Sequence, residues 1–281
     1  MSRVFRALEK AEEEKKRKGK GEPSLKVLEE RPLIEKEEPP LKLAEKKMEE
    51  WGLPSKEDIP VLLVPPHSFA AEEFRKLKTQ IFHRLPDPPH TVLITSALPQ
   101  EGKTIVAVNL AMAISQEIQK KAILIDGDIR KPGIYLERSY SSKGLSHYLS
   151  DGVALSEILI DTEMENLHLI QAGTPSRKSS ELIGSRRMGE LLKSLKESGD
   201  PTYIIIDSPP IISTADPTLL SKMVDGIILV VMADRAPKES IQRAIKSIDR
   251  HKIIGVVFNQ IDLKSSTYYS KYYYHYRYYR K

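Results

Sequence analysis

Cysteine is absent from the 281 residues, and long apolar runs are absent as well. Without cysteine the chain has no disulfide, no zinc–thiolate site and no thiol nucleophile. Its longest apolar stretch, residues 227–233, is far shorter than the ~20 residues that span a bilayer. Residues 1–20 carry charges throughout and lack the apolar core of a signal peptide. These absences predict a cytoplasmic protein.

Acidic residues are absent from the C-terminal segment 268–281, which reads YYSKYYYHYRYYRK. This segment holds eight of the twelve tyrosines, and its four basic residues give most of the chain's net charge of +5. The rest of the chain is therefore nearly neutral, so its charge does not favour binding to nucleic acid. Such a density of phenols is not typical of a protein core or of an ordinary linker.

Composition divides the chain into four parts. After Ser2, apolar residues recur at helical spacing, which predicts a short helix over 1–19, either a docking helix for a partner or a frayed helix without a role. Residues 20–66 are rich in Pro, Glu and Lys without an apolar period, which predicts a linker. A folded domain over 67–264 and a tyrosine-rich tail over 265–281 follow.

Within the folded domain, β-branched apolar runs alternate with amphipathic segments. The predicted strands cover residues 91–96, 122–126, 167–170, 203–207, 226–232 and 253–258. The predicted helices cover residues 69–85, where Pro86 ends the helix, and 103–119, 186–197, 216–223 and 237–251. This alternation predicts an α/β fold, with a parallel β-sheet flanked by helices on both faces.

A phosphate-binding loop pattern, ALPQEGKT, follows the strand at 91–96, with alanine at its first position. Backbone N–H groups and the next helix N-terminus would hold phosphates, Lys103 would reach the β- and γ-phosphates, and the Thr104 hydroxyl would bind Mg²⁺. A chance strand–loop–helix turn is the alternative. The loop residues expected to bind ATP are Ala97, Leu98, Pro99, Gln100, Glu101, Gly102, Lys103 and Thr104.

Aspartates stand at the ends of two other predicted strands. Asp126 and Asp128 lie in ILIDGDIR, and Asp207 lies in IIIDSPP. Ligands of an open parallel sheet bind beyond the carboxyl ends of its strands, so we expect the three carboxylates to meet near the phosphates and Mg²⁺. A capping or turn role would explain any one of them but explains all three poorly.

Together these elements resemble the catalytic domain of the bacterial tyrosine kinases (BY-kinases), which control capsule and exopolysaccharide assembly. That family has a P-loop, an apolar-D-x-D-x-R motif (here 126–130), an aspartate before a proline pair (here 207–210) and a C-terminal tyrosine cluster. The resemblance covers roughly residues 68–281. It implies a P-loop NTPase architecture like that of MinD and ParA, with ATP and Mg²⁺ as cofactors. It also implies a protein-tyrosine autokinase.

The resemblance assigns roles residue by residue. Asp126 would accept the tyrosine proton, Asp128 and Asp207 would hold Mg²⁺, and Lys103 would stabilise the transferring phosphoryl group. The acceptors would be Tyr268, Tyr269, Tyr272, Tyr273, Tyr274, Tyr276, Tyr278 and Tyr279.

Two further segments match the family less closely. Asn259 and Asp262 resemble the segment near the adenine, and an ordinary strand-to-loop turn is an equally good interpretation of them. Glu72, Arg75 and Lys78 resemble the oligomerisation pattern E-x-x-R-x-x-R, with lysine in place of the last arginine. A lysine does not reproduce a bidentate guanidinium contact, and a solvated charged helix face is the alternative.

The family also implies partners. We expect a homo-oligomer that phosphorylates tails between subunits, and a separate membrane activator of the polysaccharide chain-length-determinant type that recruits the kinase to the inner face of the membrane. Other protein-tyrosine substrates are possible, and no nucleic-acid partner is expected.

Two competing hypotheses stay open at this point. One is a MinD/ParA-like ATPase without kinase activity, although such proteins carry a second lysine at the position of Leu98. The other makes the tail a binding module for single-stranded nucleic acid or an anionic membrane. Replacing the tail tyrosines by phenylalanine separates these ideas, since stacking survives that change and phosphate acceptance does not.

Overall fold

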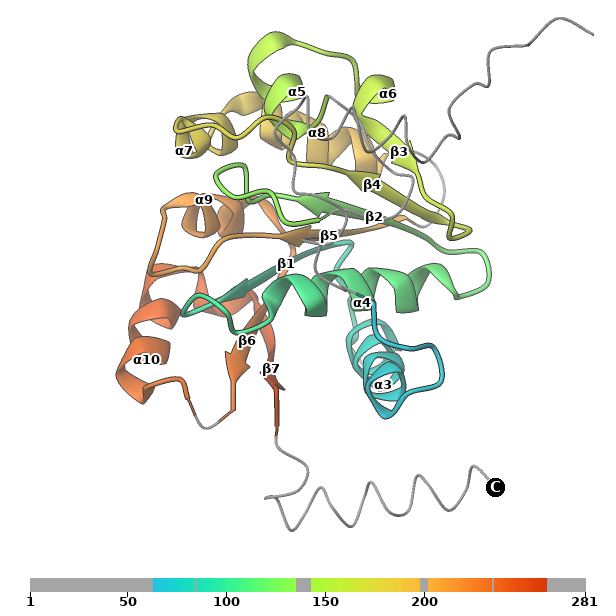
Figure 1. Ribbon diagram of the computed structural model, residues 1–281, viewed down its shortest axis with the longest axis vertical. Coiled ribbons are helices and arrows are strands. Elements are labelled where there is room, and N and C mark those ends of the chain that lie inside the picture. Colours follow the sequence, from blue (N-terminus) through green and yellow to red (C-terminus); the bar gives the residue numbers. More distant parts are fainter. Residues whose placement is uncertain (1–62, 84, 135–142, 198–201, 234, 262–281) are drawn as a thin grey trace, which may run out of the picture. The chain divides into compact units, whose positions relative to one another are not determined.

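The computed structural model describes residues 63–83, 85–134, 143–197, 202–233 and 235–261 (Figure 1). The predicted helix at 1–19, nearly all of the linker and the tyrosine-rich tail lie outside these residues. Those three expectations, and the domain boundaries that depend on them, therefore stay predictions.

A single seven-stranded sheet organises the described part of the chain. Its strands are β1 (Thr91–Ser96), β2 (Lys121–Asp126), β3 (Leu159–Asp161), β4 (Leu167–Ile170), β5 (Thr202–Asp207), β6 (Gly226–Met232) and β7 (Ile253–Asn259). They are ordered β3-β4-β2-β5-β1-β6-β7. All neighbouring pairs are parallel except β3 with β4, which is antiparallel. The predicted parallel sheet is confirmed, with one antiparallel edge strand that was not predicted.

Helices cover both faces of this sheet, as the sequence predicts (Figure 1). They are α3 (Phe69–His83), α4 (Lys103–Ser115), α5 (Leu145–Asp151), α6 (Leu155–Ile158), α7 (Ser179–Ile183), α8 (Arg186–Lys196), α9 (Asp216–Met223) and α10 (Lys238–Ser247), with a 3₁₀ turn η1 (Arg250–Lys252). Helices α3 and α4 pack on one face, and α7, α8, α9 and α10 on the other.

Several predicted helix ends are wrong. Helix α3 ends at His83, before Leu85, and α4 ends at Ser115 rather than near residue 119. Gln119 has a positive φ of 61°, which a continuing helix does not allow. Helix α10 ends at Ser247, and the Asp249 side chain accepts a hydrogen bond from the His251 N–H to start η1. The short elements α5, α6, α7 and β3 were not predicted, because three to seven residues carry too little periodicity.

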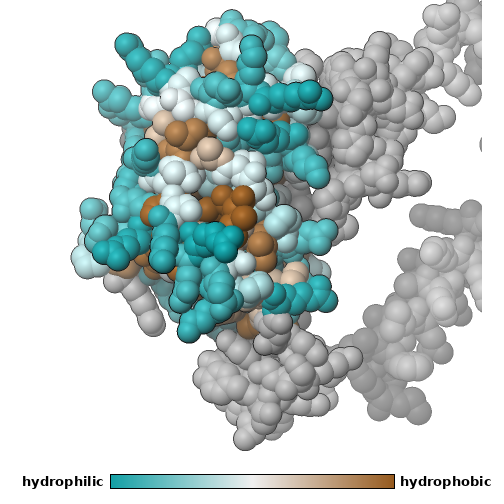
Figure 2. Space-filling view, turned by 90° about the vertical axis from the view of Figure 1, so that its left-hand side faces the viewer, coloured by the Kyte–Doolittle hydropathy of each residue, from teal (hydrophilic) through white to brown (hydrophobic). Residues whose placement is uncertain are grey.

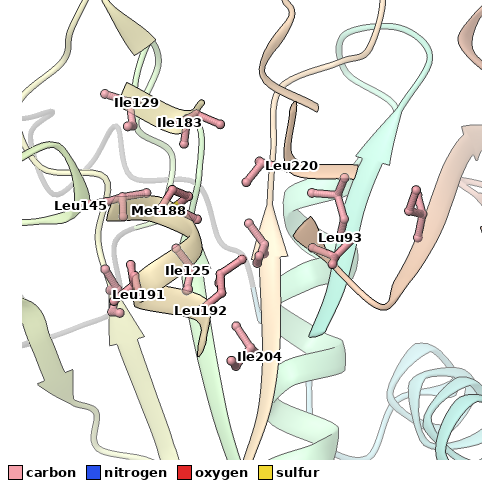
Figure 3. Close-up of a cluster of buried hydrophobic side chains, with 14 of the residues drawn as sticks. Leu93, Ile125, Ile129, Leu145, Ile183, Met188, Leu191, Leu192, Ile204 and Leu220 are labelled. Carbon is pink, nitrogen blue, oxygen red and sulfur yellow. The ribbon is translucent and has the colours of Figure 1, made fainter. Parts of the chain in front are cut away.

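The core between the sheet and α8 illustrates how the pattern produces the packing. Met188, Leu191, Leu192 and Leu195 recur at helical spacing along α8, and all four are buried. Figure 3 shows three of them, Met188, Leu191 and Leu192, directed toward the strand side chains that include Ile125 and Ile204. Truncating one such leucine to alanine would cost about 2–5 kcal/mol of stability.

Helix α4 is apolar on nearly all sides. This composition suits its position, since the sheet covers one side of the helix and α3 packs on another. Its buried Asn109 accepts a hydrogen bond from the Val64 N–H at 2.9 Å and donates one to the Ile105 carbonyl at 2.7 Å. The helix is therefore a fixed support, and its N-terminus carries the phosphate-binding loop.

Candidate active site

Three neighbouring strands bring the predicted site residues to one edge of the sheet. Strand β5 lies between β2 and β1, and Asp126 at the end of β2 is the register partner of Asp207 at the end of β5. The phosphate-binding loop begins directly after β1. The three carboxylates and the loop therefore converge as expected.

Gly127 allows the chain to cross from β2 over the end of β5. Its N–H donates to the Asp207 carbonyl at 2.9 Å, and a Cβ at this position would lie 2.6 Å from the same oxygen. Only glycine fits this close approach of two backbones. The glycine of ILIDGDIR thus fixes Asp126 and Asp128 on either side of the crossing.

The loop from Ala97 to Thr104 has the conformation of an anion-binding turn. Gln100 and Gly102 have positive φ values of 64° and 84°, and α4 begins at the next residue, Lys103. The first N–H groups of a helix have no intrahelical acceptor and carry its positive dipole end, so they favour a phosphate here. Ala97, which stands where the pattern usually has glycine, is fully buried, so its methyl group packs inside the protein.

Glu101 and Asn259 hold this loop in place. The buried Glu101 carboxylate accepts hydrogen bonds from the Leu98 N–H at 2.6 Å and the Met232 N–H at 3.2 Å. The Asn259 amide donates to the Glu101 carbonyl at 3.0 Å. Both residues were expected to bind ATP, and the structure shows that their side chains contact the protein. We call Glu101 and Asn259 the loop brace.

Lys103, Thr104 and Asp207 form a connected polar cluster at the start of α4. The Thr104 hydroxyl donates to Asp207 Oδ2 at 2.7 Å, and Lys103 Nζ donates to that hydroxyl at 3.1 Å. Lys103 Nζ lies 3.7 Å from Asp207 Oδ2. Burial raises the pKa of Asp207, although the charge of Lys103 and the hydroxyl of Thr104 oppose the rise.

The second oxygen of Asp207 shows that this cluster fits a metal ion. Asp207 Oδ1 is buried and has no hydrogen-bond partner among the described residues. A buried carboxylate oxygen without a donor is costly, and a cation would remove that cost. One hydroxyl and one or two carboxylates, completed by phosphates and water, is the ligand set that Mg²⁺ prefers. No group of three or more carboxylates or imidazoles in the described ranges could hold a metal by itself.

Asp126 is buried with its two oxygens facing backbone donors. Oδ1 accepts from the Asp128 N–H at 3.1 Å, and Oδ2 accepts from the N–H groups of Gly133 and Ile134 at 2.9 and 3.0 Å. Burial, followed by the charge of Asp207, raises the pKa of Asp126 to about 7, against these backbone bonds. Its ionised and protonated forms are therefore close in free energy near neutral pH.

Asp128 is more accessible than Asp126, with 9% of its surface exposed against 1%. Oδ1 accepts from the Lys131 N–H at 3.0 Å. Burial is also the main reason why the pKa of Asp128 is raised. A metal ion can therefore reach the Asp128 carboxylate more easily than that of Asp126.

A neighbouring cluster around Asp216 was not foreseen from the sequence. The fully buried Asp216 carboxylate accepts from the hydroxyls of Ser179 and Ser180 at 2.6 and 2.5 Å. Arg130 Nη2 donates to the Ser180 hydroxyl at 3.1 Å, and Arg130 Nε lies 3.7 Å from Asp216. This cluster ties the loop after β2 to α7 and α9. The only sequence signal was an Asp-Pro pair, which indicates a helix start.

The three residues of the expected oligomerisation pattern do not form one exposed surface. Glu72 and Arg75 pair with each other along α3 at 2.7 Å, with their side chains about a third or more exposed. The Lys78 side chain is only 15% exposed, and its Nζ lies 3.5 Å from Glu117, which Lys120 and His83 also contact. Lys78 therefore points toward the turn that follows α4 in the same chain. Asp262 and the eight tail tyrosines lie outside the described residues.

Comparison with known proteins agrees with this geometry. Residues 100–256 match the family described as "AAA domain". The "Tyrosine-protein kinase CpsD" of Streptococcus pneumoniae serotype 4 is 33% identical over 187 residues, which are 65% of this chain and 81% of that protein. This chain belongs to the bacterial tyrosine kinases. It is accordingly a protein-tyrosine kinase with a P-loop nucleotide site.

Solved structures place the fold in the same group. The structure titled "Crystal structure of the chimerical protein CapA2B2" matches with a TM-score of 0.66 and 30% identity, covering 77% of this chain and 99% of that chain. The cell division ATPase MinD of Pyrococcus furiosus matches with a TM-score of 0.52 and 17% identity, covering 66% and 78% of the two chains. The second match shows the fold alone. It confirms the predicted MinD/ParA-like architecture.

Proposed function

We propose that this kinase transfers the γ-phosphoryl group of ATP to the tyrosines of a C-terminal tail, that of a neighbouring subunit in an oligomer. The observation that carries the proposal is that Asp126 and Asp207, at the ends of the adjacent strands β2 and β5, meet Lys103 at the start of α4. This arrangement combines a buried carboxylate of pKa about 7 with a cationic group and a phosphate-binding loop.

The proposed reaction divides its work among few residues. The loop N–H groups bind the phosphates, and Lys103 neutralises charge on the transferring group. A phenol titrates near pH ~10, so its proton must pass to a base as the oxygen attacks the γ-phosphorus. Asp126 takes that proton while the bond from the γ-phosphorus to the bridging oxygen of ADP breaks.

Thr104, Asp128 and Asp207 would hold Mg²⁺, which supplies charge neutralisation on the phosphate oxygens. The Thr104 hydroxyl donates to Asp207 at 2.7 Å, which places both groups where they would hold one cation. Asp207 Oδ1, which has no hydrogen-bond partner within the described ranges, supports this assignment.

The length of the tail supports transfer between subunits. About 17 residues follow Lys264, and at ~3.3 Å each they extend ~50–60 Å, enough to reach a neighbour. Glu72 and Arg75 on α3 are the exposed candidates for the subunit contact, whereas Lys78 is engaged with Glu117. Each phosphate adds about −1.5 to −2 charges, so two or three would cancel the tail's +4 and favour its release from an acidic metal site.

The biological setting follows from membership of the family. We place the kinase in capsule or exopolysaccharide assembly, activated by a separate membrane protein of the chain-length-determinant type that brings it to the inner membrane face. No helix within the described ranges has the length and apolar character to cross a bilayer. Other protein tyrosines are further candidate acceptors.

A mixing experiment tests transfer between subunits. The donor is the chain with all eight tail tyrosines changed to phenylalanine, and the acceptor is Lys103→Met with its tail intact. Radiolabelled phosphate should appear on the acceptor tail, and the rate should fall on dilution. An unlabelled acceptor beside a wild type that labels itself would show transfer within one chain. The acceptor alone is the control.

A further inference from the structure

Two consecutive isoleucines follow the proline pair after β5, and they have opposite environments. Ile211 is 5% exposed and belongs to the core, while Ile212 is 41% exposed. The Ile211 N–H donates to the Ser96 carbonyl at 2.8 Å, and the Ile212 N–H donates to the Ala97 carbonyl at 3.4 Å. Ile212 is therefore fixed beside the first residues of the phosphate-binding loop, with its side chain toward solvent.

The position of Ile212 makes its exposure informative. A single exposed isoleucine is ordinary in a soluble protein. The exposed large apolar residues in the described ranges are Ile118, Ile212, Val256 and Phe258. Ile212 follows β5 by five residues, whereas Ile118 lies past the far end of α4, and Val256 and Phe258 lie on the edge strand β7. Figure 2 looks onto the end of the molecule where the phosphate-binding loop and α9 lie, and it shows apolar patches in the middle of a largely hydrophilic surface.

The chemistry of the site leaves one substrate group without a contact. The loop amides, Lys103, Thr104 and the aspartates are polar and suit phosphates, a metal ion and a proton. A tyrosine acceptor also brings an aromatic ring, which buries a large apolar area when it binds. Leu98 is partly buried, follows Ala97 directly and packs against the same core cluster as Ile211. It stands where related ATPases carry a lysine.

We propose that Ile212, with Leu98 beside it, is the surface on which the ring of the acceptor tyrosine lies while its hydroxyl faces Asp126. This inference rests on the proposed phosphorylation of tyrosine side chains at this site. Ile212 is then a specificity-determining residue. It favours tyrosine over serine and threonine, because the short side chains of serine and threonine have no ring that could bury apolar area against Ile212.

The test uses the full chain and a synthetic peptide of residues 265–281 as acceptor. Ile212→Asp should raise the KM for the peptide about tenfold, more than it changes kcat or the KM for ATP, because an apolar contact of this size is lost. Ile212→Ala should raise the KM for the peptide less, and Ile212→Leu should leave it close to that of the wild type. The control Ile118→Asp places the same charge on an exposed site at the far end of α4.

Four outcomes would overturn the inference. The first three are an unchanged peptide KM in Ile212→Asp, an equal effect of Ile118→Asp, and a peptide KM in Ile212→Leu as high as in Ile212→Asp. The fourth is a parallel loss of peptide and ATP binding, since it would indicate a distorted loop. A wild type that transfers phosphate to no tyrosine would instead contradict the proposed function.

Discussion

The candidate active site has two parts, the acidic half formed by Asp126, Asp128 and Asp207, and the loop brace formed by Glu101 and Asn259. They differ in how many of their polar atoms are hydrogen-bonded. In the acidic half, burial raises the pKa of Asp126, Asp128 and Asp207, and one oxygen of Asp207 has no hydrogen-bond partner in the part of the chain that the structure describes. In the loop brace, both oxygens of Glu101 and the amide of Asn259 are hydrogen-bonded to the backbone. We propose that the half with the unsatisfied oxygen binds ligands and takes up protons, whereas the satisfied half holds the loop by hydrogen bonds.

The largest expected effect tests whether the acidic half is catalytic. Asp126→Asn should lower kcat for tyrosine phosphorylation about 10²–10⁴-fold, because an amide cannot accept the phenol proton. Asp128→Asn should instead raise the Mg²⁺ concentration required for half-maximal rate. The measurement is a Mg²⁺ titration of peptide phosphorylation for both variants. Full rescue of Asp126→Asn by excess Mg²⁺ would assign the metal role to Asp126 and leave the base unassigned.

A second prediction concerns pH and the stability of the metal-free protein. A carboxyl group whose folded pKa lies above its unfolded value binds its proton more tightly in the folded state, so stability falls as pH rises between the two values. For Asp126 that window runs from 3.8 to about 7, and Asp128 and Asp207 shift in the same direction. Thermal unfolding in EDTA should therefore show a lower midpoint at pH 8 than at pH 5.5.

Controls make that pH measurement specific to the acidic half. Asp126→Asn should reduce the difference between the two pH values, and Mg²⁺ with ADP should reduce it too, because a nearby cation favours the ionised carboxylates. A midpoint that rises from pH 5.5 to pH 8 in EDTA would contradict the description of this half.

The loop brace should respond to mutation through stability and ATP binding. Glu101→Gln places an amide group against a backbone N–H and leaves one buried donor unpaired, at a cost of about 1–3 kcal/mol. Urea unfolding should show a lower free energy of unfolding, and kinetic assays should show a higher KM for ATP. Asp151→Asn, at an exposed position away from the loop, is the control for loss of one negative charge. A Glu101→Gln variant of wild-type stability with weak ATP binding would favour direct contact with the nucleotide.

The smallest effect concerns the second brace residue. Asn259→Ala should cost roughly 1 kcal/mol, since it removes one hydrogen bond to the Glu101 carbonyl. A Cβ at Gly102 would lie 2.0 Å from the Asn259 amide nitrogen. Gly102→Ala should therefore lose less stability when combined with Asn259→Ala than the sum of the single losses. If the losses in free energy of unfolding are additive, the cost of Gly102→Ala comes from the positive φ at this position and not from the clash with Asn259.

Local pattern predicted much of the fold and of the site. Strands at 91–96, 167–170 and 226–232 and the helix at 216–223 have the predicted bounds, because buried runs and their breakers are local features. The same holds for the aspartates, which end their strands as expected. The local pattern did not indicate which distant residues these side chains contact: Lys78 lies 3.5 Å from Glu117, and Asn259 contacts Glu101. Their expected roles in oligomerisation and ATP binding stay predictions.

From the residues alone, one could determine that strands and helices alternate, that a phosphate loop follows the first strand, and that aspartates end two others. Tertiary structure decided that β5, far along the chain, lies between β2 and β1, so that Asp207 faces Asp126 and reaches Thr104. It also decided which acids are buried enough to shift their pKa and which polar side chains hydrogen-bond to the loop. The reason is physical: parallel strands pair across long crossover connections, and burial depends on the whole core, so neither is contained in a local pattern.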